Sequence, residues 1–274
     1  MKTSTRLSSV LLAAGILAAG FFASAGAASA QTILIKDTFT NNATDRKEGD
    51  KLAGTSPEES LTADVTWKSV LPDNLVFSST GTIVRAANST AEARIAISVP
   101  TTITTITADL KGINGGWSSI GFTTSDTTSL SGAWAAPGYG TALWMRIQAG
   151  SYFINTNGTA TQVQSGSIAG FSYSKTYTVE LSYNPVTFQV SLKISNAGAE
   201  VVNTGWLDTT LTSATTIGAA GFRLEGAVIA AETNSPVVDN FSVVAANNIP
   251  EPSTYALLAG IIMFAGCILL RGRK

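Results

Sequence analysis

Residues 143–148 hold the side chains best suited to bind a ligand. Leu, Met and Ile alternate there with Trp144, Arg146 and Gln148, and successive strand side chains point to opposite faces. We therefore expect the aliphatic residues in the core and the other three outside. An exposed indole offers a flat face to a sugar ring, and arginine and glutamine offer planar hydrogen-bond partners. Three more aromatic residues lie near glycines and would extend this platform: Trp117, Trp134 and Tyr139. The alternative is that these rings fill the core or cover sheet edges.

The residue types needed for catalysis are scarce. The chain has no histidine, which removes Ser-His-Asp and Cys-His sites and every metal site built on imidazole. Glycoside hydrolysis needs two carboxylates about 5 to 9 Å apart across a cleft. Glu58 and Glu59 are adjacent in a polar stretch, where neighbouring side chains point apart. Ser172 and Lys175 have a Ser-x-x-Lys spacing, but in a turn and strand rather than a helix. We therefore expect no catalytic residue and no cofactor.

Net charge, the placement of carboxylates and the single cysteine bear on partners, metals and disulfides. Residues 31–249 hold 12 basic and 17 acidic side chains, a formal charge of −5, which argues against nucleic acid as a partner. If the terminal strands pair, Asp37 and Asp239 would be the carboxylates available to a structural calcium. Two carboxylates fall short of the six to eight oxygens that calcium takes, so no metal ligand is assigned. The single cysteine, Cys267, lies in the C-terminal apolar run, so no disulfide forms within one chain.

Residues 1–30 have the features of an export signal. Two basic residues precede an apolar run at 7–22, and Ala28 and Ala30 supply the small side chains that signal peptidase accepts. We expect cleavage before Gln31; the alternative is an uncleaved anchor. In either case the segment that follows is exported.

The other end carries a second set of features. Pro250, Glu251 and Pro252 precede sixteen apolar or aromatic residues at 255–270 and a basic tail at 271–274. As a helix the run spans about 24 Å, slightly less than a bilayer core, and flanking residues can close the difference. Basic residues at both ends favour the cytoplasm, which places residues 31–249 outside.

This arrangement resembles the PEP-CTERM sorting domain of bacterial surface proteins. The resemblance covers residues 249–274. It implies that a membrane-embedded protease of the exosortase type recognises Pro250, Glu251 and Pro252 and processes the chain nearby. It also implies an inner-membrane intermediate, then the cell surface or extracellular matrix, where many members of that family accompany exopolysaccharide. The resulting division is a signal peptide at 1–30, an outer domain at 31–247 and a sorting signal at 248–274.

The outer domain has the period of β-strands. Apolar residues at 177–183 and 186–194 recur at every second position and flank Asn184 and Pro185, which predicts a hairpin. Other strands are predicted at 95–99, 104–110, 119–123, 143–147, 217–224 and 237–244. The polar stretch at 41–60 is predicted to be a surface loop. Many short strands without a helical period indicate an all-β fold of two packed antiparallel sheets.

A second resemblance rests on short elements spread over the domain. They are Asp37-Thr38-Phe39, Gly116-Trp117, Ile120-Gly121-Phe122, Gly221-Phe222 and the segment 238–243. Together they resemble concanavalin-like, laminin-G-type jelly rolls, in which the first and last strands often pair.

Three functions follow from these patterns, in order of preference. The first is a non-enzymatic surface or matrix protein, associated with extracellular polysaccharide. The alternative is a glycan-binding module with a defined site. The third is a glycoside hydrolase. Saturable binding to a glycan would separate the second from the first.

Overall fold

The computed structural model describes residues 31–42, 44–69, 71–86, 91–111, 115–126, 141–157, 161–226 and 236–246. Residues Thr32–Ala246 form one compact unit. The expected signal segment, the Pro250-Glu251-Pro252 motif, the apolar run at 255–270, Trp134 and Tyr139 lie outside the described residues. Within the described ranges, no helix is long and apolar enough to span a membrane.

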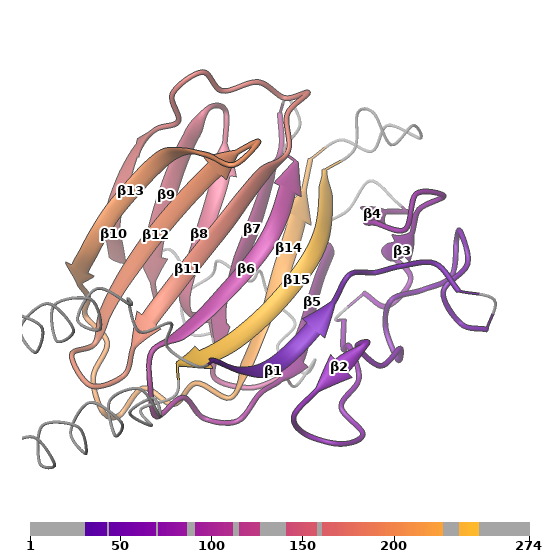
Figure 1. Ribbon diagram of the computed structural model, residues 1–274, viewed down its shortest axis with the longest axis horizontal. Coiled ribbons are helices and arrows are strands. Elements are labelled where there is room, and N and C mark those ends of the chain that lie inside the picture. The colour runs from indigo at the N-terminus through magenta and orange to yellow at the C-terminus, as the bar shows by residue number, and fades with distance from the viewer. Residues whose placement is uncertain are drawn as a thin grey trace, which may run out of the picture. The chain divides into compact units, whose positions relative to one another are not determined.

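The domain is all-β, as the sequence predicts, and its strands form two antiparallel sheets that stack face to face (Figure 1). Sheet A has the order β13-β12-β11-β6-β15-β1-β2, with β3 and β4 attached through β15. Its strands are β1 (Gln31–Asp37), β2 (Glu59–Ser60), β3 (Leu75–Phe77), β4 (Ile83–Arg85), β6 (Thr104–Lys111), β11 (Tyr177–Asn184), β12 (Gln189–Asn196), β13 (Ala199–Asp208) and β15 (Val237–Ala246).

Sheet B has the order β10-β9-β8-β7-β14-β5. Its strands are β5 (Ala91–Ala96), β7 (Trp117–Thr123), β8 (Thr141–Gln148), β9 (Ser151–Thr156), β10 (Thr161–Ser167) and β14 (Ala219–Glu225). The first and last strands, β1 and β15, are neighbours in sheet A, as the second resemblance implied.

The predicted hairpin is confirmed, with a later start for its second strand. β11 pairs with β12 in register from Thr178 and Ser195 to Asn184 and Gln189. A four-residue turn at 185–188 separates them, in which the Asn184 side chain accepts a hydrogen bond from the Val186 amide at 2.9 Å. Val186 is therefore in the turn, 75% exposed, although its apolar character continues the strand pattern.

The strand predicted at 95–99 is displaced toward the N-terminus. β5 runs from Ala91 to Ala96, and Val99 lies outside it with 58% of its surface exposed. Pro100 cannot donate to a ladder, so the chain leaves the sheet before it. The sequence of β5 is AEARIA, and its small and charged residues lack the apolar alternation that predicts a strand.

The core lies between the sheets, and rings from distant segments meet within it. Trp67, in the excursion between β1 and β3, packs its ring 5.4 Å from Phe222 of β14 and 5.2 Å from Phe241 of β15. Phe39 lies 5.8 Å from Trp67. Edge and tilted ring contacts at these distances add to the burial of apolar area.

Asp37 fastens this excursion to the end of β1. Its buried carboxylate accepts hydrogen bonds from Arg46 Nη1 at 2.6 Å, Arg46 Nη2 at 3.2 Å, Trp67 Nε1 at 2.8 Å and the Phe39 amide at 3.0 Å. Burial raises the pKa of Asp37, and these bonds oppose the rise. The carboxylate is thus engaged by protein donors on several sides.

Candidate functional site

The outer face of sheet B, which points away from the core, presents three rows of cross-strand neighbours. The row through Arg146 runs Glu92, Arg223, Ser119, Arg146, Phe153, Ser165 across the six strands. The row on one side runs Glu225, Trp117, Gln148, Ser151, Ser167, and that on the other runs Arg94, Gly221, Gly121, Trp144, Asn155, Gln162. Directly opposite residues on paired strands share a face of the sheet, so the side chains within a row are neighbours.

Arg146 stands at the centre of an aromatic cluster on this face. Its Cζ atom lies 4.6 Å from the ring centroid of Phe153, 5.5 Å from that of Trp144 and 5.8 Å from that of Trp117. The two indoles lie 5.6 Å apart and form a buried pair separate from the main core. The Cζ atom of Arg223, on the neighbouring strand β14, lies 4.8 Å from the ring centroid of Trp117. Cation–π contacts therefore hold two guanidinium groups around one indole.

The expectation that Trp144 is exposed is wrong. The side chain points to the outer face, as alternation predicts, because Leu143, Met145 and Ile147 all lie in the main core. Yet Trp144 is fully buried and Trp117 is 6% exposed. Alternation fixes the face of a sheet on which a side chain lies, but not whether that face is open to water. Neither indole offers a free ring face for a sugar.

The accessible part of the face lies toward β9 and β10. Arg146, Gln148 and Phe153 are half-buried, and Gln162 and Ser165 of the edge strand β10 are exposed. All five side chains lie on adjoining positions of β8, β9 and β10. They combine one ring, one guanidinium and three uncharged polar groups, a set that can donate to and accept from hydroxyl groups.

Two charge pairs lie at the other end of the same face. Arg94 donates to Glu92 at 2.9 Å, and Arg223 donates to Glu225 at 2.5 Å. Both carboxylates are thus held by guanidinium groups on their own strands. By contrast, Arg146 has no carboxylate within 4.0 Å among the described residues, and its buried Nε has no hydrogen-bond partner there. Burial lowers the pKa of Arg146, against the charge of Glu225, but an arginine remains cationic.

Two glycines let the strands approach closely beside Trp144. A Cβ on Gly121 would lie 2.5 Å from the Leu143 carbonyl oxygen and 2.6 Å from Trp144 Cβ. Gly221 is opposite Gly121 on β14, and a Cβ there would also meet backbone. Side chains are excluded at both positions, so the indole of Trp144 has room on the sheet.

Four of the six predicted binding residues are brought together by the structure: Trp117, Trp144, Arg146 and Gln148. Trp134 and Tyr139 lie outside the described residues. The sequence prediction missed Phe153 and Arg223. Phe153 alternates with Tyr152 and Ile154 in a strand too short to be noticed, and Arg223 interrupts the apolar pattern of β14.

No metal site emerges from the described ranges, where no group of three or more Asp, Glu, His or Cys side chains is placed to hold an ion. Asp37 is bound by Arg46, and Glu58 accepts from the Thr38 hydroxyl at 2.6 Å. Burial would raise the pKa of Glu58, but hydrogen bonds from Thr38 and Thr40 lower it overall.

No protein family model matches this chain, and no curated protein sequence matches it either. Among solved structures, a winged bean acidic lectin complexed with methyl-α-D-galactose has a TM-score of 0.47 and 10% identity over 69% of this chain and 94% of its own. The carbohydrate recognition domain of Emp47p has a TM-score of 0.43 and 12% identity over 73% and 94%. A sialidase has a TM-score of 0.42 and 13% identity over 66% of this chain, which spans 17% of the sialidase.

Likenesses with TM-scores below 0.5 do not distinguish a shared ligand from a similar layout of strands. They therefore carry no argument about the activity of this chain. The outer face of sheet B has to be interpreted from its own residues.

Proposed function

We propose that this protein is a non-catalytic, glycan-binding β-sandwich, and that the glycan lies on the outer face of β8, β9 and β10. The observation that carries the proposal is Arg146, whose guanidinium is fixed over three rings and has no carboxylate partner among the described residues. The proposed site is displaced from Trp144, which sequence reasoning favoured, to the half-buried Phe153 and its polar neighbours.

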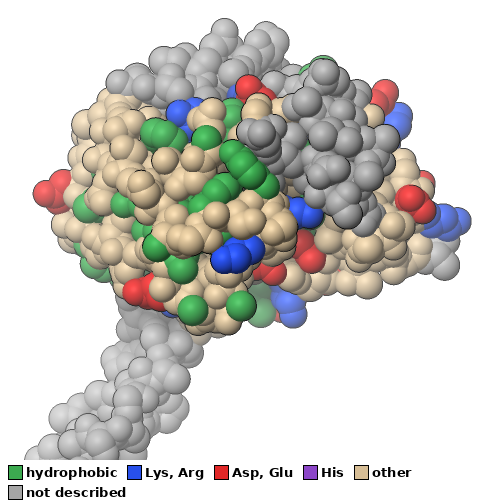
Figure 2. Space-filling model, turned by 90° about the horizontal axis from the view of Figure 1, so that it is seen from above, with side chains coloured by type: hydrophobic (Ala, Val, Ile, Leu, Met, Phe, Trp, Pro, Cys, Tyr) green, Lys and Arg blue, Asp and Glu red, His purple; other side chains and the backbone are tan. Residues whose placement is uncertain are grey.

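The geometry suits a polyol ligand for two reasons. A guanidinium held by ring contacts loses little freedom on binding and presents several donors in a fixed plane. Gln148 on β8 and Gln162 on β10 add donors and acceptors on either side of the row through Arg146, so hydroxyl groups of a sugar chain can be matched. Charged side chains are few and scattered on the face of the molecule seen in Figure 2, in keeping with a chain that is 13% charged.

Binding rather than catalysis is favoured by the state of the carboxylates on this face. Glu92 and Glu225 both bind arginines on their own strands, so neither is free to protonate a leaving group or to activate water. We include the absence of glycosidase activity in the proposal. Release of reducing sugar from any bound polysaccharide would contradict it.

The proposal is tested by titrating the full chain, in a detergent without a sugar headgroup, against a panel of extracellular polysaccharides. Tryptophan fluorescence reports on the site because Trp117 and Trp144 contact Arg146. We expect saturable binding that weakens at least about tenfold in Arg146→Ala, since a hydrogen bond to a charged group contributes about 1.5 to 3 kcal/mol.

Lys193→Ala is the matched control. It removes one cation from a half-exposed position of β12 in sheet A, where Lys193 pairs with Glu180 at 3.4 Å. Binding should be unchanged in this variant. If no polysaccharide binds, or if Arg146→Ala binds as tightly as the parent chain, the glycan site is wrong and a purely structural role remains.

We also propose that the chain is exported and sorted through its C-terminal segment. The support is the sequence alone: the Pro250-Glu251-Pro252 motif followed by an apolar run and a basic tail. Replacing the three residues by alanines should leave full-length protein in the membrane of the native cell, detected by mass spectrometry of the chain. Normal maturation of that variant would refute the sorting proposal and leave the glycan site untouched.

A further inference from the structure

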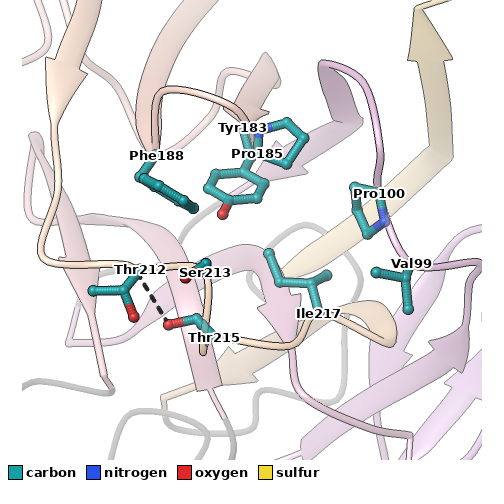
Figure 3. Close-up of a pocket in the computed structure, with 9 residues that line it drawn as sticks. All are labelled: Val99, Pro100, Tyr183, Pro185, Phe188, Thr212, Ser213, Thr215 and Ile217. Carbon is teal, nitrogen blue, oxygen red and sulfur yellow. Dashed lines mark hydrogen bonds between the residues drawn. The ribbon is translucent and has the colours of Figure 1, made fainter.

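A small pocket opens between loops at one end of the sandwich, away from the outer face of sheet B (Figure 3). Its walls come from the turn between β11 and β12, the segment between β5 and β6 and the segment between β13 and β14. Tyr183 and Ile217 line its buried part, and Thr212, Ser213 and Thr215 line the side formed by the β13–β14 segment. The volume is about 220 Å³.

The pocket combines an aromatic wall with hydroxyl groups. Tyr183 is 3% exposed, and Figure 3 shows its hydroxyl pointing toward the turn formed by Thr212 and Thr215. That hydroxyl makes no hydrogen bond within the described residues. The hydroxyl groups of the other two core tyrosines each accept one: that of Tyr152 from Gln164, and that of Tyr177 from the Ser172 amide. Burial raises the pKa of Tyr183, so the group stays protonated and can donate. The hydroxyl oxygen itself is open to the pocket rather than sealed in the core, so a ligand there can supply its hydrogen-bond partner.

The walls are formed before any ligand arrives. Phe188, which lines the pocket, has a left-handed backbone with φ of 55°. Its carbonyl accepts a hydrogen bond from Thr209 Oγ1 at 2.5 Å, which ties the β11–β12 turn to the end of β13. Across the pocket, the Thr215 hydroxyl accepts from the Thr212 amide at 3.3 Å. Turns fastened in this way lose little freedom on binding.

None of the described residues that line the pocket carries a charge, which selects against ionic ligands. The volume equals that of about seven waters at about 30 Å³ each, which is enough for one sugar ring with its hydroxyl groups. From the hydroxyl groups, the aromatic and prolyl walls and this size, we infer that the pocket binds a single neutral sugar unit, of hexose size. The pocket shares no residue with the outer face of sheet B, so the inference does not depend on the proposed function.

Calorimetric titration of the full chain with neutral methyl hexosides, in a detergent without a sugar headgroup, tests the inference. We expect at least one hexoside to bind with a dissociation constant in the millimolar range. Tyr183→Phe removes only the hydroxyl and should weaken binding by about tenfold, the usual effect of leaving a ligand hydroxyl unpaired. Tyr173→Phe, the same change in a loop outside the pocket, should have no effect.

A second variant covers the case in which loss of the hydroxyl is tolerated. Ser213 is exposed in its turn, so Ser213→Tyr should fold normally and block the mouth, abolishing binding. Arg146→Ala should leave hexoside binding intact, which separates this site from the outer face. If no hexoside binds at concentrations up to about 50 mM, or if both pocket variants bind as the parent does, the inference is overturned.

Discussion

Asp239 gives the domain a pH dependence that can be worked out from its surroundings. It lies directly opposite Asp109 where β15 pairs with β6, and like charges in that position repel. Asp109 is stabilised by the Thr178 hydroxyl at 2.6 Å and by Asn240 Nδ2 at 2.8 Å. Asp239 accepts only the Asn240 amide, at 2.8 Å, among the bonds described. Burial, and then the charges of Asp109, Glu58 and Asp37, raise the pKa of Asp239 from 3.8 to about 6.

The direction in which stability changes with pH follows from the protons bound by the folded and unfolded chains. Between pH 4 and 6 the folded chain keeps a proton on Asp239 that the unfolded chain releases, so the free energy of unfolding falls as the pH rises through this window. A shift of about two pKa units corresponds to about 3 kcal/mol. Water reaches this half-buried carboxylate and screens the repulsion, so we expect a loss of about 1 to 2 kcal/mol above pH 6.

Asp239→Asn removes the charge and keeps an acceptor for the Asn240 amide. Urea unfolding of the full chain, followed by tryptophan fluorescence, should show the variant about 1 to 2 kcal/mol more stable than the parent at pH 8 and within about 0.5 kcal/mol of it at pH 4. A carboxyl ¹³C titration should give a midpoint for Asp239 near 6. An equal stability difference at both pH values would refute the electrostatic reasoning, because it would mean that the side chain acts through packing.

Two further substitutions test the packing that supports the fold and the site. Asp37→Asn keeps the shape of the side chain but removes the closer of the two carboxylates beside the buried Arg46 and leaves it, among the described residues, only Glu58, at 3.6 Å. We expect a loss of about 3 kcal/mol in urea unfolding, and a loss below about 1 kcal/mol would show that the Asp37–Arg46 ion pair is dispensable. Gly121→Ala places a Cβ against the Leu143 carbonyl and Trp144. We expect the free energy of unfolding to fall by about 1 to 3 kcal/mol and the tryptophan fluorescence to change. An unchanged spectrum would contradict the packing described for Trp144.

The local pattern of residues was enough to predict the class of fold. A period of two is a property of the strand itself, so the hairpin of β11 and β12 and the core positions of β8 could be found from neighbours in sequence. The strand predicted at 217–224 matches β14, whereas β5, with small and charged residues, was found only in part because its burial depends on cross-strand partners.

What the sequence determined by itself is therefore the alternation along each strand and, through it, which side chains share a face. Only the tertiary structure decided that Trp144 is covered, that Phe153 and Arg223 join Arg146, and that Tyr183 opens into a pocket. The physical reason is that sheet register and loop packing join residues far apart in the chain. Trp117 of β7 meets Arg223 of the neighbouring strand β14, and no local period encodes that contact.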